Sequence, residues 1–443
     1  GDVFLKQGDS LELKCDSLNY DGKIKKFFSY GKVYLINNKT TLNSNELLYD
    51  RKKNVASFFN GGNIIDSLTT IQSKRGDYLL EIDKYKFRND ITITNPDYMI
   101  ESESLDYIVG QEKTYFIDST KITGDSYQIT CNRGFYDGKL MKGYFLDNAK
   151  ILLNERIIKG DSIFFDDEMK YASAAKNISI FDRNEKLQIL GEFAEIFEKK
   201  DSAIVTKNPV AINTSEIDSL FISADTLYSV GDKENRIIKG LNNVKFFKKN
   251  MSGKSDFVLI NENRGLTRLI RKVLEKKELQ VLSQEQINML NPIIWDGNSQ
   301  ISGDEIILKE NNETNKLDSL IVTNNGFIVE KDTLGIDNYN QIKGIKILGK
   351  FFKGKIKSLK VDQNAEIIYH MYDDDNELIG VDKAVSSSIM ITMSEKGIDK
   401  IRFITDPEGI LYPDDFLDKN EKFLEGFINR QNEKINDKWD LFE

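Results

Sequence analysis

Few residues of this 443-residue chain are of the types that enzymes use for catalysis. His370 is the only histidine, and the chain has neither a G-x-S-x-G sequence nor a Cys-His signature. A Ser-His-Asp or Cys-His site would therefore have to use His370. We interpret His370 instead as a half-exposed strand residue beside Tyr369 and Tyr372. The sequence offers no catalytic residue, and we expect no enzymatic activity.

Carboxylates are the second group that could do chemistry. The run 373–377, Asp-Asp-Asp-Asn-Glu, could supply oxygen ligands to calcium. Its spacing lacks the glycine and the bidentate glutamate of an EF-hand, so we interpret it as a polar hairpin turn before Leu378. Other aspartates recur along the chain and could suggest the paired carboxylates of a polysaccharide lyase or hydrolase. They occur once per repeat, which is typical of a structural turn residue, and we expect no metal and no cofactor.

The two cysteines, Cys15 and Cys131, are too few for a disulfide framework and do not form a close metal-ligand pair. Each stands one place before an Asp or Asn of the repeat described next, on the same parity as the apolar residues. We therefore expect two buried thiols and no disulfide.

A short cluster of the form apolar-x-apolar-x-x-Asp-x-apolar-x-aromatic recurs along the chain, followed by a polar turn and a further strand. The first copy spans 11–22 and continues at 31–35; the second spans 42–50 and continues at 62–64. Later copies are centred on Glu103, Asn132, Asp161, Glu192, Asp225, Asp256 and Asp304. A spacing of roughly 30 residues lies within the range of solenoids and other repeat arrays.

Within each copy the apolar residues alternate with period two, which predicts strands with one apolar face. In the first copy the apolar positions are odd before Asp16 (Leu11, Leu13) and even after it (Leu18, Tyr20). One extra residue must therefore be absorbed at Asp16, and a bulge or sharp bend there would keep both sets facing inward.

These features predict an all-β fold: an elongated repeat β-jelly-roll, or β-taco, of bent antiparallel strands with a continuous apolar inner face. Unpaired strands are expected at both ends of such a stack. Residues 265–290 carry Leu266, Leu269, Ile270, Val273 and Leu274 at helical spacing, which predicts an amphipathic helical insertion. The apolar residues after Asp414 predict a C-terminal helix. The expected organisation is β-taco modules at 1–264, the insertion at 265–290, a continuation of the β-taco at 291–413, and a helical tail at 414–443.

Composition excludes several classes of protein. The net charge is -9 and the lysines and arginines are mixed with acidic residues, so nucleic acid is not an expected partner. No apolar run approaches the length of a membrane-spanning helix. The sequence starts at Gly1-Asp2-Val3 without an initiator methionine or a signal peptide, as expected at a mature boundary.

The repeated residues resemble a known family. Cys15-Asp16-Ser17-Leu18-Asn19-Tyr20 followed by Gly31-Lys32-Val33 is similar to the repeat of the OstA-like (LptA-type) lipopolysaccharide transport proteins, which form a periplasmic bridge to the outer membrane. The resemblance extends to about Pro413, and the stretches 340–344 and 378–384 look like the long OstA-like proteins of the Bacteroidetes group.

The resemblance implies a β-jelly-roll whose apolar interior receives the acyl chains of lipid A while the sugars stay outside. It implies a periplasmic location, association with the outer-membrane assembly machinery, and pairing with other lipopolysaccharide-transport proteins by β-augmentation of end strands, including head-to-tail self-association. Carried over by position, the implied lipid-binding lining is Leu11, Leu13, Leu18, Tyr20, Val33, Leu35, Leu47, Tyr49, Leu105, Tyr107, Tyr136, Ile163, Phe165, Ile178, Ile180, Ile196 and Ile212.

The apolar inner face fits two interpretations. It is either a groove that holds lipid or a filled hydrophobic core, and inward apolar residues usually only pack. In the second case the protein would be an extracytoplasmic β-repeat scaffold that binds protein partners only.

Overall fold

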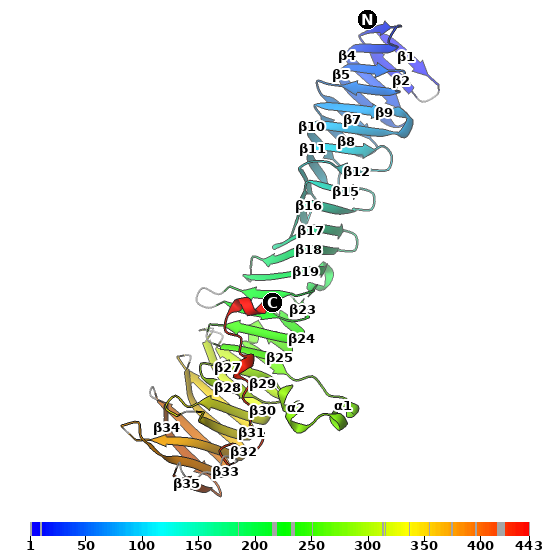
Figure 1. The fold of residues 1–443 in the computed structure, drawn as a ribbon. Helices are drawn as coiled ribbons and strands as arrows, with labels where there is room; N and C mark the ends of the chain where they lie inside the picture. The colour runs from blue at the N-terminus through cyan, green and yellow to red at the C-terminus, as the bar shows by residue number, and fades with distance from the viewer. Residues whose placement is uncertain are drawn as a thin grey trace. The chain divides into compact units, whose positions relative to one another are not determined.

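The computed structural model (Figure 1) describes residues 2–8, 11–184, 186–214, 219–231, 235–249, 251–311, 314, 316–335, 337–353, 355–373, 375–394, 397–413 and 421–442. Antiparallel strands make up most of this part of the chain, which confirms the all-β fold class. The chain divides into two compact units, Gly1–Asn184 with Gln188–Lys199, and Glu185–Leu187 with Lys200–Glu443.

The first unit is a stack of hairpins in which successive strands pair with antiparallel neighbours. Its strands are β1 (Val3–Gln7), β2 (Leu11–Cys15), β3 (Ser17–Asp21), β4 (Lys26–Asn37), β5 (Thr40–Asp50), β6 (Val55–Phe58), β7 (Gly62–Asp66), β8 (Thr69–Ser73), β9 (Arg75–Leu79), β10 (Lys84–Thr94), β11 (Met99–Ile108), β12 (Lys113–Phe116), β13 (Thr120–Thr123), β14 (Tyr127–Cys131), β15 (Arg133–Asp137), β16 (Lys142–Leu153), β17 (Arg156–Asp166), β18 (Tyr171–Asp182) and most of β19 (Leu187–Phe197). A 3-10 turn, η1 (Leu80–Ile82), follows β9.

The second unit continues the same antiparallel pattern with longer strands toward its C-terminal end. Its strands are β20 (Ser202–Thr206), β21 (Val210–Asn213), β22 (Leu220–Ser223), β23 (Thr226–Val230), β24 (Ile237–Lys248), β25 (Met251–Asn261), β26 (Leu266–Ile270), β27 (Ile293–Asp296), β28 (Ser299–Ser302), β29 (Glu305–Asn311), β30 (Lys316–Lys331), β31 (Tyr339–Phe352), β32 (Lys355–Tyr372), β33 (Leu378–Ser394), β34 (Gly397–Ile404) and β35 (Glu408–Tyr412). Its helices are α1 (Lys276–Val281) and α2 (Gln284–Met289), and 3-10 turns lie at Glu262–Arg264, Gln431–Glu433 and Lys438–Leu441. The 3-10 turn Glu198–Lys200 falls at the division between the two units.

Each long strand of the first unit bends once and so belongs to two half-sheets. The first half of β16 pairs with β15 and its second half pairs with β14, with a register shift between Leu146 and Ala149. The half-sheet that contains β2, β7, β8, β13 and β14 is called the first wall here. The half-sheet that contains β3, β6, β9, β12 and β15 is the second wall. The buried side chains lie on the inner faces of the two walls.

The bend is built by two consecutive residues in the left-handed region, where Asn and Gly are favoured. In β24 these are Asn242 and Asn243, with φ of 58° and 49°. The Asn243 amide donates to both carboxylate oxygens of Asp225, at 3.0 and 3.1 Å. The same side-chain pairing joins Asn177 to Asp161 and Asn325 to Asp304. The repeated aspartate is therefore a corner residue, as its once-per-repeat spacing indicates.

The change of parity across Asp16 is confirmed. In β4 the bend falls at Gly31, with φ of 72°, and a Cβ there would lie 2.4 Å from the Asp16 carboxylate, so glycine fits the corner. Tyr20 is in register with Phe27 and stacks on it at 4.5 Å, and Phe27 is in register with Tyr49 on the inner face. The even-numbered residues after Asp16 thus share a face with the odd-numbered residues before it.

The helix predicted over 265–290 is correct only in its second half. Leu266, Leu269 and Ile270 belong to strand β26, which pairs with β25 and β29, so the helical spacing of these three residues is overridden by cross-strand pairing. Helix begins only at Lys276, in the two short helices α1 and α2. No helix in the described residues is long and apolar enough to cross a membrane.

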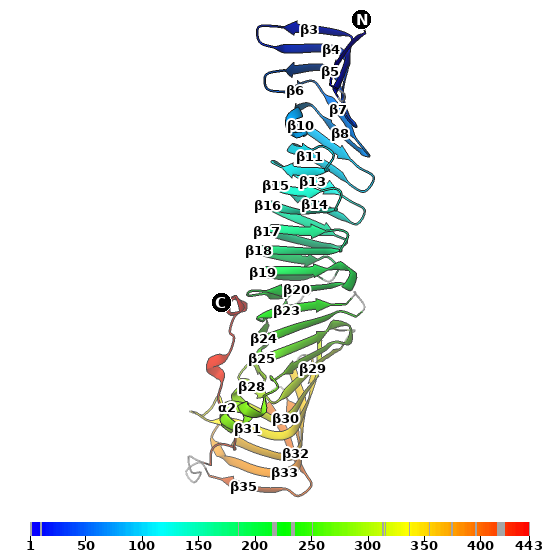
Figure 2. The ribbon, with the colours of Figure 1, turned by 90° about the vertical axis from the view of Figure 1, so that its right-hand side faces the viewer.

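Residues 414–420, where the C-terminal helix was predicted to begin, lie outside the described residues. In 421–442 the chain has only the 3-10 turns Gln431–Glu433 and Lys438–Leu441 and otherwise extends across the strands of the second unit (Figure 2). The predicted helix is therefore wrong for this part of the tail. The apolar residues that suggested a helix anchor an irregular segment instead: Leu424 is 5% exposed and packs against Phe327 and Val329.

His370 is buried, with 4% of its surface exposed, and is not the half-exposed residue expected. It lies in β32 in register with Val381, which belongs to the cluster that contacts the tail. Its Nδ1 lies 3.2 Å from the Asn340 side-chain oxygen. The 373–377 run is a hairpin turn as predicted: the Asp373 carboxylate accepts the backbone N–H of Asp375 and Glu377 between β32 and β33, while residue 374 lies outside the described residues.

Candidate functional site

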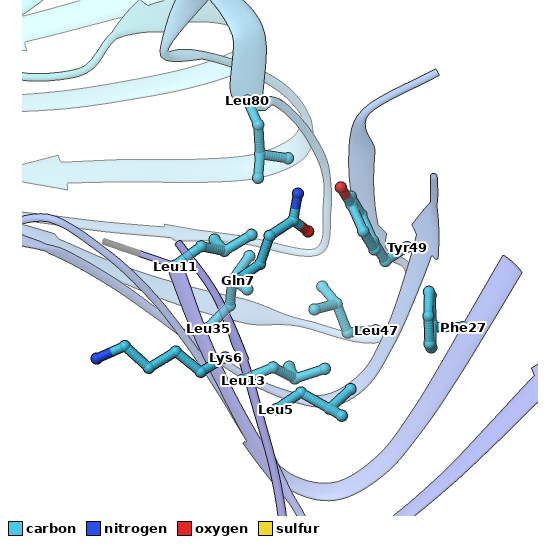
Figure 3. Close-up of a pocket in the computed structure, with 10 residues that line it drawn as sticks. All are labelled: Leu5, Lys6, Gln7, Leu11, Leu13, Phe27, Leu35, Leu47, Tyr49 and Leu80. Carbon is cyan, nitrogen blue, oxygen red and sulfur yellow. The ribbon is translucent and has the colours of Figure 1, made fainter. Parts of the chain in front are cut away.

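An apolar cavity of about 160 Å³ opens between the two walls near β1 (Figure 3). It is lined by Leu5, Lys6, Gln7, Leu11, Leu13, Phe27, Leu35, Leu47, Tyr49 and Leu80. Leu5, Leu13 and Leu35 stand in register on β1, β2 and β4 of the first wall. Phe27, Leu47 and Tyr49 face them from the second wall. Period-two alternation in each strand brings these apolar side chains to the same inner face.

The cavity lies at the end of the stack, where the outermost strands β1 and β3 are short. Among the described residues β1 pairs only with β2, and β3 pairs only with β4, so both are edge strands. Leu5 keeps 37% of its surface exposed and Tyr20 keeps 45%. An exposed apolar surface inside a concave sheet is typical of a binding site for an apolar ligand.

Further along the first unit the interior is filled by aromatic rings. Tyr78 and Tyr85 stack at 4.2 Å, and Tyr85 and Phe87 stack at 5.1 Å. All three are at most 1% exposed, and so are Tyr107 and Tyr136. This part of the inner face is a packed core in the structure and leaves no room for a ligand unless the walls separate.

Hydrogen bonds of tyrosine hydroxyls link the first wall to the second wall along the edge where the two walls are not joined by the chain's bends. The Tyr107 hydroxyl on the second wall donates to Asp66 on the first at 3.0 Å. Tyr127 and Tyr136 hydroxyls lie 3.1 Å apart across the same gap. The Asn37 side chain of the first wall donates to Tyr78 of the second at 2.6 Å. We call Tyr78, Tyr107, Tyr127 and Tyr136 the tyrosine clasp.

The clasp hydroxyls are held in their neutral form. Burial raises the pKa of Tyr127 to about 12, although the hydrogen bond with Tyr136 acts in the opposite direction. Burial also raises the pKa of Tyr107 far above its usual value, and the charge of Asp66 adds to this effect. Protonated phenols can donate across the gap, so the clasp stays formed at neutral pH.

The second unit has a smaller inner cavity of about 50 Å³ among Ile301, Ile328, Ile342, Ile367 and Ile391. Glu330 and Tyr369 lie at this cavity. Burial raises the pKa of the Glu330 carboxyl, and Asn340 hydrogen-bonds it. This cavity is too small to hold more than one or two water-sized groups.

The predicted lining residues do not all lie in the same surroundings. Leu11, Leu13, Leu35, Leu47 and Tyr49 surround the N-terminal cavity. Tyr20 lies on the inner face beside it through its contact with Phe27. The remaining inner-face residues are packed in the core of the first unit and are at most 4% exposed: Val33, Leu105, Tyr107, Tyr136, Ile163, Phe165, Ile178, Ile180 and Ile196. Leu18 is partly buried and in register with Ser29 and Leu47.

Ile212 in the second unit differs from the rest. The buried residues in register on β21, β22 and β24 are its neighbour Ala211 together with Ile222 and Phe246. Ile212 is in register with Phe221 instead and is only partly buried, so it lies on the opposite face from the one predicted.

The structure adds lining residues that the repeat did not single out. Phe27 and Leu5 complete the cavity, and Leu80 of η1 closes it from above. Phe27 shares the alternation of its strand and could have been found from it. Leu80 stands in a 3-10 turn, where no strand pattern marks its direction.

Both cysteines are buried free thiols, as predicted. Burial raises the pKa of the Cys131 thiol to about 12. In the described parts of the chain, no group of three or more His, Cys, Asp or Glu side chains is arranged to hold a metal ion.

Comparison with known families agrees with the resemblance noted in the sequence. Residues 1–103 match the model of the family described as OstA-like protein. All ten residues that line the N-terminal cavity fall inside the matched segment. A search of curated proteins finds no match to this chain.

Proposed function

We propose that this protein carries lipopolysaccharide through the periplasm toward the outer membrane, and that the N-terminal cavity takes up an acyl chain of lipid A. The observation that supports this most directly is an apolar, partly open cavity inside the segment that matches the OstA-like family. Families of this kind transport and bind, and the proposal needs no catalytic group.

The size of the cavity sets how much lipid it can hold. A cavity of about 150 Å³ lined by aliphatic and aromatic side chains is large enough for benzene, which has six carbons. The cavity here is about 160 Å³, so it fits roughly six methylenes of one acyl chain by the same comparison. At about 0.8 kcal/mol per buried methylene this insertion contributes roughly 5 kcal/mol. The other chains of a lipid A molecule would need more of the interior.

Opening of the tyrosine clasp would supply that space. The predicted lining residues Tyr107, Tyr136 and Phe165 could then contact acyl chains that they exclude in the closed state. Each clasp hydrogen bond contributes on the order of 1 kcal/mol, which is small beside the roughly 5 kcal/mol gained for every six methylenes buried. Opening must also separate the packed inner-face side chains such as Tyr85 and Phe87, and in the proposed bound state the acyl chains take over those apolar contacts.

The edge strands at this end suit partners of the same architecture. In the described part of the chain β1 and β3 are each paired along one side, and the backbone groups of the other side can pair with an end strand of another lipopolysaccharide-transport protein or of a second copy. The proposal therefore includes transfer of lipid along a continuous inner face formed by joined stacks.

A scaffold that binds only proteins is the second candidate. The filled aromatic interior around Tyr85 and Phe87 favours it, because such a core needs no ligand. The two functions differ in one observable, which is whether lipid reaches the inner face.

Photo-crosslinking in cells tests the proposal. A photoreactive residue at Leu35 or Leu47, which line the cavity, should capture lipopolysaccharide, and the native protein should copurify with lipid detectable by mass spectrometry. The neighbouring positions Tyr34 and Leu48 point to the other face and are matched controls. Capture of protein alone, or equal labelling on both faces, would favour the scaffold.

A further inference from the structure

The outer face of one half-sheet of the second unit is apolar and is covered by the chain's own residues 421–442, called the tail here. A row of side chains in register runs across five strands of this face, from β27 to β32. The row consists of Trp295, Gln300, Val329, Gln341 and Ile368, none more than 3% exposed. The tail crosses these strands and does not pair with them as a strand (Figure 2).

Two buried glutamines of the row hold the tail by its backbone. The Gln341 amide donates to the carbonyl of Lys422 at 2.8 Å, and its oxygen accepts the N–H of Leu424 at 2.9 Å. Gln300 repeats the arrangement six residues further on, with the carbonyl of Ile428 at 2.6 Å and the N–H of Arg430 at 2.9 Å. Each side-chain amide thus satisfies two backbone groups that flank one tail residue, as a neighbouring strand would.

Apolar side chains of the tail fill the face between the glutamines. Leu424 packs with Phe327, Val329, Ile368 and Val381. The Phe427 ring lies 5.5 Å from Tyr339 and 6.5 Å from Phe327. These contacts favour an aliphatic residue at position 424 and an aromatic residue at position 427. The two glutamines bond only main-chain groups of the tail, so they do not select its side chains.

A buried arginine gives the tail a third anchor. Arg430 is 6% exposed and donates to the carbonyl of Asn291 at 3.0 Å. Its guanidinium also forms two hydrogen bonds with Glu433, at 2.9 and 3.0 Å, and Lys254 lies 3.6 Å from the same carboxylate. The positive charge of Arg430 is therefore neutralised by Glu433, which also belongs to the tail. Outside the tail, Arg430 contacts the neutral carbonyl of Asn291, and Lys254 contacts Glu433.

We propose that this outer face is a peptide-recognition groove and that the tail is a ligand bound in cis, able to dissociate and rebind. The groove recognises an extended segment with an aliphatic residue, an aromatic residue three positions later and an arginine three positions after that, as at Leu424, Phe427 and Arg430. Binding through side-chain amides instead of a strand ladder lets the segment leave without breaking the sheet.

Cutting the connection to the tail in the full-length protein tests the groove. A protease site inserted after Pro413 is cleaved in the folded chain, and a fluorescent peptide of residues 421–443 is added. The tail should stay bound after cleavage, and the labelled peptide should exchange with it at a saturable site. A peptide with Leu424→Asp and Phe427→Asp should fail to exchange, although the protein that presents the groove is unchanged.

Variants of the groove give an independent measurement. Gln341→Leu removes two hydrogen bonds to the tail and should weaken peptide binding about 30-fold. Gln72→Leu, at an exposed position in the first unit, should leave it unchanged. Loss of the tail immediately on cleavage, or equal exchange of the wild-type and doubly substituted peptides, would overturn the proposal.

Discussion

Filling the N-terminal cavity from β1 should weaken lipid binding without unfolding the protein. Leu5 suits this change, because it lines the cavity and still exposes 37% of its surface on an edge strand. A tryptophan there can enter the open space without displacing a packed neighbour. Its ring would occupy the volume proposed for roughly six methylenes, which are worth roughly 5 kcal/mol.

The Leu5→Trp variant should therefore bind lipopolysaccharide at least tenfold more weakly, with an upper limit of roughly three orders of magnitude. The measurement is the Kd of the full-length protein for lipopolysaccharide, together with the midpoint of thermal unfolding. Phe4→Trp is the matched control, since Phe4 is the next residue of the same strand, points to the opposite face and is 54% exposed.

The thermal midpoint separates a filled cavity from a damaged fold. Leu5→Trp should unfold at the same temperature as the wild type or above it, because the ring adds apolar contacts. Lipopolysaccharide binding by Leu5→Trp with the affinity of Phe4→Trp would refute the assignment of the cavity as the acyl-chain site.

Three further changes test the architecture. Phe165→Ala in the packed core should lower the free energy of unfolding by about 3–5 kcal/mol, whereas Phe164→Ala on the outer face should cost much less in the same denaturant titration. Asn243→Ala should cost about 1–3 kcal/mol, because alanine is strained at a φ of 49° and the bond to Asp225 is lost; Asn243→Gly should recover the backbone part. Because burial raises the pKa of Tyr127 to about 12 from 10.0, its contribution to stability is full below pH 10 and is lost as the pH rises toward 12. Tyr127→Phe should flatten that alkaline loss in unfolding measured against pH, and an unchanged slope would contradict the burial argument.

The sequence by itself determined the strand content and the inner face of the first unit. Alternation with period two sets which residues share a face, whatever the neighbours are, so the amino-acid pattern alone assigns Leu13, Leu35 and Leu47 to the inner face. The bend at Asp16 likewise follows from the sequence. The apolar positions change from odd to even numbers there, and both sets can face inward only if a bulge or bend takes up one extra residue. The recurrence of aspartate at that bend indicated a corner and not a catalytic site.

Local patterns failed where tertiary pairing competed with them. Leu266, Leu269 and Ile270 have helical spacing, yet β25 and β29 offer them partners on both sides and they form a strand. The resemblance implies that Ile212 faces inward, but only the register with β22 decides which of two adjacent apolar residues faces the core.

Only the tertiary structure decided whether the inner face is open and what covers the outer one. A space remains between the two walls only where the side chains of their inner faces do not fill it. How these side chains pack against each other cannot be read from the sequence. The consecutive apolar residues 327–329 and 293–295 signal strands buried on both faces. That the covering segment is the tail follows from contacts across more than eighty residues, such as that of Gln341 with Leu424, which no local pattern contains.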